Sequence, residues 1–390
     1  MGHQVIFFIN GHAAIIIVYG STFQSAAFFK IGMVLRYIFL LLLYSLSSFG
    51  QRKTENLVIV TLDGMRWQEV FQGMDEHLSK DSAYTKGYAR MQKQFGGVTP
   101  ADRRERLLPF FWNEIVHSGQ LYGNRYIDSK VNNANPHYFS YPGYNEIFTG
   151  FPDSNINSND KINNPHVNVL EFIQRDEKYV GRVAVFSSWD VFPYIFNEDR
   201  SRIYINSNHD TLAFEGPVFD LLNQMQRLIP EPVGLRPDVL TYFAARAYLL
   251  KFNPAVLYIA FDETDDYAHA GNYDQYLQSA HSADKMIGDL WSLIQTHPGY
   301  RDKTTLVVTT DHGRGHQRKS DWRHHGKAVS DAGQIWIGVM GPDTPPKGEM
   351  WHTGQIFQMQ IAPTLARLLG LQFVADHPLP DIIHTFFHDK

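Results

Sequence analysis

Short apolar runs that end abruptly in acidic residues recur along this chain. Three of them, Leu57–Leu62, Val256–Phe261 and Thr305–Thr310, have the length and the β-branched or aromatic content of buried strands. The first is followed by Asp63, the second by four carboxylates within five residues, and the third by Asp311. Buried strands with polar residues at one end are typical of a parallel sheet, in which ligands bind beyond the carboxyl ends of the strands.

Other segments extend this pattern into an alternation of strands and helices. Arg182–Ser187 and Gln334–Met340 have the apolar content of further buried strands. Apolar residues recur at helical spacing from Leu277 to Ile294, and a helix is also expected over Pro237–Phe252. The alternation predicts an α/β fold.

The domain organisation follows from the extent of the strand pattern. The 390 residues are 44% hydrophobic and 19% charged, as in globular proteins. The strands that end in aspartate are spread over most of the chain, so we expect a single domain over residues 51–390. Two stretches without a clear period, near 80–106 and 190–235, are expected to be insertions in that domain. Residues 1–50 are interpreted as an N-terminal extension and signal peptide.

The segment Met33–Gln51 has the pattern of a secretory signal. Arg36 precedes an apolar run, Tyr37–Leu46, and small residues follow it up to Gly50. The apolar run is too short to span a bilayer comfortably. We therefore expect cleavage near Gly50, an exported protein that is periplasmic or secreted, and no stable membrane span after cleavage. An uncleaved anchor is the alternative, and residues 1–32 are interpreted as an upstream extension.

The net charge and the absence of cysteine limit which partners and which kinds of catalytic or metal site are possible. The net charge is −5 and no long basic run occurs, so nucleic acid is not expected as a stable partner. The absence of cysteine excludes disulfides, thiolate metal sites and a cysteine nucleophile. Any metal must be held by carboxylate, imidazole or hydroxyl groups. The 18 histidines supply nitrogen donors, which together with carboxylates suit zinc or manganese.

Histidines accompany two of the acidic strand ends. Asp265 and His269 are four residues apart, a spacing that on a first helical turn puts both side chains on one side of the chain. His312 follows Asp311 directly. Each feature alone is also compatible with a helix N-cap and a surface histidine. If the three strands are parallel neighbours, however, Asp63, Asp265 and Asp311 meet in one crevice and can hold a divalent cation.

A hydroxyl group lies at the start of a predicted helix. In the segment Tyr138–Gly150, with the sequence YFSYPGYNEIFTG, Ser140 precedes a Pro-Gly pair and then a helical stretch. A hydroxyl at such a junction can lie at the helix N-terminus, where its anion is stabilised. The alternative is that Ser140 only caps the helix.

Together these motifs resemble the metal and nucleophile set of the alkaline phosphatase superfamily, and most closely its nucleotide pyrophosphatase/phosphodiesterase-like branch. The branch's T-F-P-N-H-Y motif, followed by T-G, is similar to the run from Ser140 to Thr149-Gly150. Its E-x-P-D-x-x-G-H motif is similar to the run from Asp262 to His269. The resemblance implies a three-layer sandwich in which helices flank a mostly parallel central sheet.

The resemblance also implies an exported hydrolase of small-molecule phosphate esters that forms a phosphoseryl intermediate on Ser140. Two divalent metal ions, Zn²⁺ or alternatively Mn²⁺, would be bound. One ion would be held by Asp265, His269 and His325, and the other by Asp63, Asp311, His312 and the Ser140 oxygen. His325 is chosen over His324 because it precedes a glycine, as the family's ligand does. Asn159 would contact the substrate phosphate.

Several alternatives stay open at this stage. A sulfatase carries its nucleophile in C/S-x-P-x-R, whereas Tyr144 occupies the fifth position here. The others are a phosphoglycerate mutase-like isomerase and a non-catalytic binding protein on the same fold. Gly143 and Tyr144 replace Asn and His of the phosphodiesterase-like motif, which leaves the preference for monoesters or diesters undecided.

Overall fold

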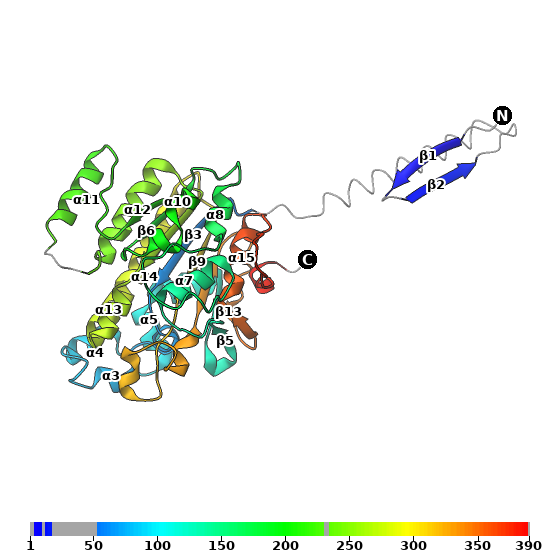
Figure 1. The fold of residues 1–390 in the computed structure, drawn as a ribbon. Helices are drawn as coiled ribbons and strands as arrows, with labels where there is room; N and C mark the ends of the chain where they lie inside the picture. The colour runs from blue at the N-terminus through cyan, green and yellow to red at the C-terminus, as the bar shows by residue number, and fades with distance from the viewer. Residues whose placement is uncertain (1–3, 10–11, 18–52, 230–233, 389–390) are drawn as a thin grey trace. The chain divides into compact units, whose positions relative to one another are not determined.

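The computed structural model describes residues 4–9, 12–17, 53–229 and 234–388 (Figure 1). The chain divides into two units, Met1–Gln51 and Arg52–Lys390. In the first unit, β1 (Gln4–Ile9) pairs antiparallel with β2 (His12–Ile17). The predicted signal segment, Met33–Gln51, lies outside the described residues.

An eight-stranded sheet forms the centre of the second unit, in the order β12-β4-β11-β9-β3-β8-β6-β7. The strand β3 (Asn56–Leu62) pairs in parallel with β9 (Thr304–Thr309) on one side and with β8 (Val256–Phe261) on the other. The parallel pairing continues from β8 to β6 (Val183–Ser187) and from β6 to β7 (Tyr204–Ser207). The three predicted strands that end in aspartate are therefore adjacent and run in the same direction.

The other half of the sheet is mixed. The strand β11 (Ile337–Met340) is antiparallel to both of its neighbours, β9 and β4 (Gly119–Tyr122), and β12 (Gly348–Glu349) lies parallel to β4 at the edge. The strand predicted over Gln334–Met340 is thus two strands separated by Trp336. Its first part belongs to a small sheet made of β10 (Gln334–Ile335), β5 (Ser129–Asn132) and β13 (Gly354–Phe357).

Helices cover both faces of the central sheet. Side chains alternate along β3, so that Val58 and Val60 pack in one hydrophobic core while Leu57 and Ile59 pack in the other. The first core includes residues of α2 (Trp67–Gln72), α12 (Asp238–Phe252) and α14 (Tyr273–Thr296), and the second includes residues of α7 (Ser140–Thr149), α8 (Val169–Gln174) and α15 (Ile361–Leu368). The predicted three-layer α/β sandwich is confirmed. Within the described residues, no helix is both long enough and apolar enough to cross a membrane.

The first predicted insertion, 80–106, is more regular than expected. It contains α4 (Tyr88–Phe95) and most of α5 (Pro100–Leu107). Met91 and Phe95, one helical turn apart on α4, are both fully buried. These two apolar residues pack the short helix against the first core. That the segment is an insertion stays a prediction.

The second predicted insertion, 190–235, also contributes to the core of the fold. Its strand β7 pairs in parallel with β6 and forms one edge of the central sheet. The helix α11 (Pro217–Arg227) follows, with Phe219 and Leu222 buried in the first core. The part of this segment that contains β7 therefore belongs to the central sheet.

Candidate active site

Three parallel strands deliver carboxylates to one edge of the sheet. Asp63 directly follows β3, Asp311 follows β9, and Asp265 lies in the first turn of α13 (Glu263–His269), which follows β8. The imidazole of His312 lies among them. Its Nε2 atom is 3.4 Å from Asp63 Oδ1, 3.5 Å from Asp311 Oδ2 and 3.8 Å from Asp265 Oδ1. The structure thus brings the three predicted strand ends together around one histidine.

His269 and His325 extend the cluster on the side of Asp265. The Nε2 atoms of the two imidazoles are 2.9 Å apart, and His269 Nε2 lies 3.1 Å from Asp265 Oδ2. The His325 ring stacks on that of His312, with 4.0 Å between the ring centroids. His324 is exposed to solvent. Of the two adjacent histidines, it is therefore the predicted one, His325, that reaches the cluster.

Polar atoms that point into the cluster are buried but unpaired. Within the described residues, Asp63 Oδ1, Asp311 Oδ2 and His312 Nε2 have no hydrogen-bond partner. Leaving such a group unsatisfied costs about 1–3 kcal/mol. Ligand atoms of these three residues lie within 4.8 Å of one another, and the same holds for Asp265, His312 and His325. Carboxylates and imidazoles so arranged fit the coordination of divalent transition metals.

The clustered carboxylates repel one another, and a bound cation would offset this repulsion. Burial and the neighbouring Asp265 carboxylate raise the pKa of Asp63 well above its ordinary value. Burial and the carboxylate of Asp63 do the same to the pKa of Asp311. Burial also disfavours the ionised form of Asp265, but Arg314 and the imidazoles of His269, His312 and His325 together outweigh it and hold that pKa below its ordinary value. A divalent cation would remove the repulsion that keeps Asp63 and Asp311 from ionising together.

The helix α7 packs its first turn against these aspartates. Ser140, the first residue of the helix, is 6% exposed. A Cβ atom at Gly143 would lie 2.4 Å from the carbonyl oxygen of Asp311, so only glycine allows this approach. The Tyr144 hydroxyl donates a hydrogen bond of 2.8 Å to Asp63 Oδ2. Gly143 and Tyr144, which replace Asn and His of the nucleophile motif, therefore both lie against candidate metal ligands.

Asn159 lies beside the same turn of α7. Its Oδ1 atom accepts a hydrogen bond of 3.0 Å from the backbone N–H of Tyr141, the residue after Ser140, and its side chain is exposed. This position is next to the proposed nucleophile. A contact between Asn159 and a substrate phosphate stays a prediction.

Sequence reasoning missed the role of Arg314. This residue is fully buried, and its guanidinium forms an ion pair with Asp265. It also donates to the carbonyl of Gly64 over 3.1 Å and to that of Arg323 over 2.8 Å. Its position two residues after His312 was the one signal in the sequence that it lies near the site. The polar loop contains several basic residues, and the sequence does not indicate which of them is buried.

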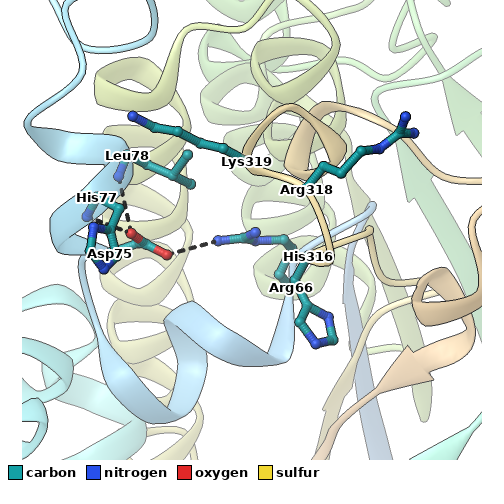
Figure 2. A pocket seen from close by; sticks show the side chains of 7 residues that line it. All are labelled: Arg66, Asp75, His77, Leu78, His316, Arg318 and Lys319. Carbon is teal, nitrogen blue, oxygen red and sulfur yellow. Dashed lines mark hydrogen bonds and ion pairs between the residues drawn. The ribbon is translucent and has the colours of Figure 1, made fainter.

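A charged pocket of about 270 Å³ lies among residues that follow Asp63 and His312 in the sequence. It is lined by Arg66, Asp75, His77, Leu78, His316, Arg318 and Lys319 (Figure 2). The cations of this pocket are neutralised by neighbouring carboxylates. Arg66 forms an ion pair with Glu69, Arg318 with Asp321 and Lys319 with Asp81. The Nδ1 atom of His316 lies 3.3 Å from Asp331. The pocket therefore has little excess positive charge, and His316 is engaged away from the cluster.

Comparison with known proteins assigns the chain to a family. A family model described as Sulfatase matches residues 131–371, more than half of the chain. A search of curated protein sequences found no match. Similar solved structures include the lipoteichoic acid synthase LtaP from Listeria monocytogenes, with 13% identity, a TM-score of 0.53 and coverage of 84% of this chain and 74% of that one.

Two further structures have the same fold. The wild-type alkaline phosphatase PafA is 10% identical with a TM-score of 0.54, and the match covers 88% of this chain and 100% of PafA. A putative sulfatase from Bacteroides thetaiotaomicron is 13% identical with a TM-score of 0.54, and the match covers 85% and 74% of the two chains. The predicted superfamily is confirmed, while the phosphodiesterase-like branch stays a prediction. This protein belongs to the sulfatase family and is a hydrolase of the alkaline phosphatase superfamily.

Proposed function

We propose that this protein hydrolyses phosphate esters through a phosphoseryl intermediate on Ser140. The observation that carries the proposal is the packing of the first turn of α7 on Asp63 and Asp311, each of which has a buried carboxylate oxygen without a hydrogen-bond partner among the described residues. A nucleophilic hydroxyl next to a cation site is the arrangement that metal-assisted phosphoryl transfer requires.

The candidate ligands form two sets that adjoin at His312. One ion would be held by Asp63, Asp311, His312 and the Ser140 oxygen, and the other by Asp265, His269 and His325. Zinc is our first choice because imidazole and carboxylate donors are combined, and manganese is the alternative. Bound there, the two ions would lower the pKa of the serine hydroxyl and offset the negative charge of the phosphate.

The residues of the chain then supply the nucleophile and position the candidate metal ligands. The Ser140 hydroxyl gives up its proton to solvent, and its oxygen attacks phosphorus in line with the ester oxygen. The bond from phosphorus to the ester oxygen breaks, and the alcohol leaves with a proton taken from water. A second water molecule attacks the phosphoserine, which releases phosphate and restores the hydroxyl. The N-terminus of α7 favours negative charge on the serine and on the phosphoryl oxygens. Tyr144 and Arg314 hold Asp63 and Asp265 in place.

Sulfate esters are the second candidate substrates. The matching family model is named for sulfatases, and Ser140-Tyr141-Pro142 fits the first three positions of C/S-x-P-x-R. Tyr144 takes the place of the arginine, and its hydroxyl is engaged with Asp63. This use of the fifth position leads us to favour phosphate over sulfate.

Turnover of three chromogenic esters by the zinc-loaded protein tests the proposal. We expect p-nitrophenyl phosphate or bis-p-nitrophenyl phosphate to be hydrolysed in preference to p-nitrophenyl sulfate. Ser140→Ala should abolish turnover and leave the circular dichroism spectrum unchanged, whereas Ser292→Ala, at an exposed helical serine, should behave as the wild type. Turnover of the sulfate ester alone would overturn the choice of substrate, and near-normal activity of Ser140→Ala would overturn the nucleophile.

We also propose that the protein is exported, on the strength of the signal pattern in Met33–Gln51. The mature protein isolated from the extracytoplasmic fraction should begin close to residue 51. An N-terminus that retains Tyr37–Leu46 would instead indicate an uncleaved anchor.

A further inference from the structure

A second group of potential metal ligands lies beyond the C-terminal end of α7. His166, Asp376 and His377 each offer one ligand atom, and these atoms lie within 4.8 Å of one another. His166 belongs to the loop between α7 and α8, whereas Asp376 and His377 belong to the segment that follows α15. The proposed hydrolysis uses none of the three residues.

One nitrogen of His377 is engaged and the other is available. Its Nδ1 donates to the carbonyl of Pro378 over 3.3 Å, which leaves a lone pair on Nε2. This Nε2 atom is buried and, within the described part of the chain, has no hydrogen-bond partner. The ring is fixed by stacking on Phe151, at 4.7 Å between centroids and 13° between planes. The stacked ring therefore presents a buried lone pair that no other described residue satisfies.

His166 shows the same division between its two ring nitrogens. Its Nε2 donates to Asp153 Oδ2 over 2.8 Å, which leaves the lone pair on Nδ1. The other carboxylate oxygen, Asp153 Oδ1, accepts bonds of 2.9 Å from the backbone N–H and from the side-chain amide of Asn155. The rings of His166 and His377 lie 5.4 Å apart at 90°. Histidines that bind metals usually donate their second N–H to a carboxylate or a carbonyl, as both do here.

We propose that His166, Asp376 and His377 bind a further divalent transition metal ion, separate from the catalytic cluster. Two imidazoles and one carboxylate, with water in the fourth position, form a donor set typical of zinc. Asp376 is exposed, so the ion can enter from solvent. Hydrogen bonds to Asp153 and Pro378 set each histidine in the tautomer that the ion requires.

The ion would tie the C-terminal segment to the loop that carries Asn159. Asp153 and His166 lie at the two ends of that loop, and Asn159 lies between them, bonded to the backbone of the residue after Ser140. Bound only by the folded chain, the ion stabilises the native state by mass action. It would also restrict the motion of a loop that borders the proposed nucleophile.

Counting zinc on the full chain tests this proposal. The protein is stripped of metal with a chelator, reloaded with excess zinc sulfate and desalted. Its zinc content per chain is then measured by elemental mass spectrometry. His377→Phe keeps a ring that can stack on Phe151 but removes both nitrogens. We expect this variant to hold one zinc fewer per chain than the wild type, and to gain less in melting temperature on zinc addition. Its hydrolytic activity should persist, because His377 is outside the catalytic cluster.

The matched control is His384→Phe, at an exposed histidine of the same C-terminal segment, which should hold as much zinc as the wild type. Asp376→Asn, at an exposed position, should again lower the count by one, and it decides the outcome if His377→Phe does not fold. Equal zinc content in the wild type and in a folded His377→Phe or Asp376→Asn variant would overturn the proposal. If the catalytic cluster bound no metal, every total would fall, but the difference of one would persist.

Discussion

Tyr144→Phe removes a single hydroxyl group, the one that contacts Asp63 in the candidate metal cluster. The side chain is 1% exposed, and its ring packs edge-on against Phe192 with 4.7 Å between centroids, a contact that phenylalanine can keep. The hydrogen bond from the hydroxyl to Asp63 Oδ2 is lost. The substitution therefore tests how strongly the positioning of Asp63 supports metal binding, with little change in packing.

The size of the effect follows from the charge of the acceptor. A hydrogen bond to a charged group contributes about 1.5–3 kcal/mol, and about 1.4 kcal/mol corresponds to a factor of ten. Zinc affinity at the Asp63 site should fall by about 10- to 150-fold. Burial raises the pKa of Asp63, and the hydroxyl of Tyr144 opposes this rise. Without the hydroxyl, protons compete better with zinc, so the loss should be larger at acidic than at alkaline pH.

Zinc dependence of p-nitrophenyl phosphate hydrolysis, measured on chelator-treated protein, provides the assay. Tyr300→Phe is the control, because this tyrosine is 2% exposed and donates one bond of 2.7 Å to the carbonyl of Pro254, just before β8 begins. Both variants lose one buried hydroxyl, but the zinc dependence should change in Tyr144→Phe alone. If Tyr144→Phe required no more zinc than the wild type, the proposed support of Asp63 would be refuted.

Two other substitutions give independent tests. Gly143→Ala places a Cβ atom 2.4 Å from the Asp311 carbonyl oxygen, so the first turn of α7 must shift. We expect the variant to lose about 1–3 kcal/mol of stability and to show a clear fall in kcat. Unchanged stability and unchanged kcat would contradict the close approach. Asp284→Asn tests a buried carboxylate, because burial raises the pKa of Asp284 to about 7 despite bonds from the N–H groups of Phe110 and Phe111. The folded state therefore keeps a proton that the unfolded state has lost, and the stability of the wild type should fall as pH rises from about 4 to 7, by up to about 1.4 kcal/mol per unit. Urea unfolding of the variant should show a flatter dependence on pH, and an unchanged slope would exclude Asp284 as its source.

Local patterns were sufficient for most of the framework. The strands β3, β8 and β9 were visible as apolar runs, because a strand buried on both faces needs apolar side chains throughout. Their terminal aspartates were visible because the apolar runs stop where the strands leave the sheet. Trp336 divides one predicted strand between two sheets, and no local signal marks that division.

The sequence by itself determined the α/β class and the acidic strand ends, since each depends on side-chain types at short spacing. The seven residues proposed for metal binding came from the resemblance to a family. Only the tertiary structure decided that β9, β3 and β8 are neighbours, and hence that Asp63, Asp265 and Asp311 meet. It also decided that Arg314 turns inward and that His166 approaches His377. These contacts join segments far apart in the chain, and their geometry depends on how the whole core packs rather than on any local period.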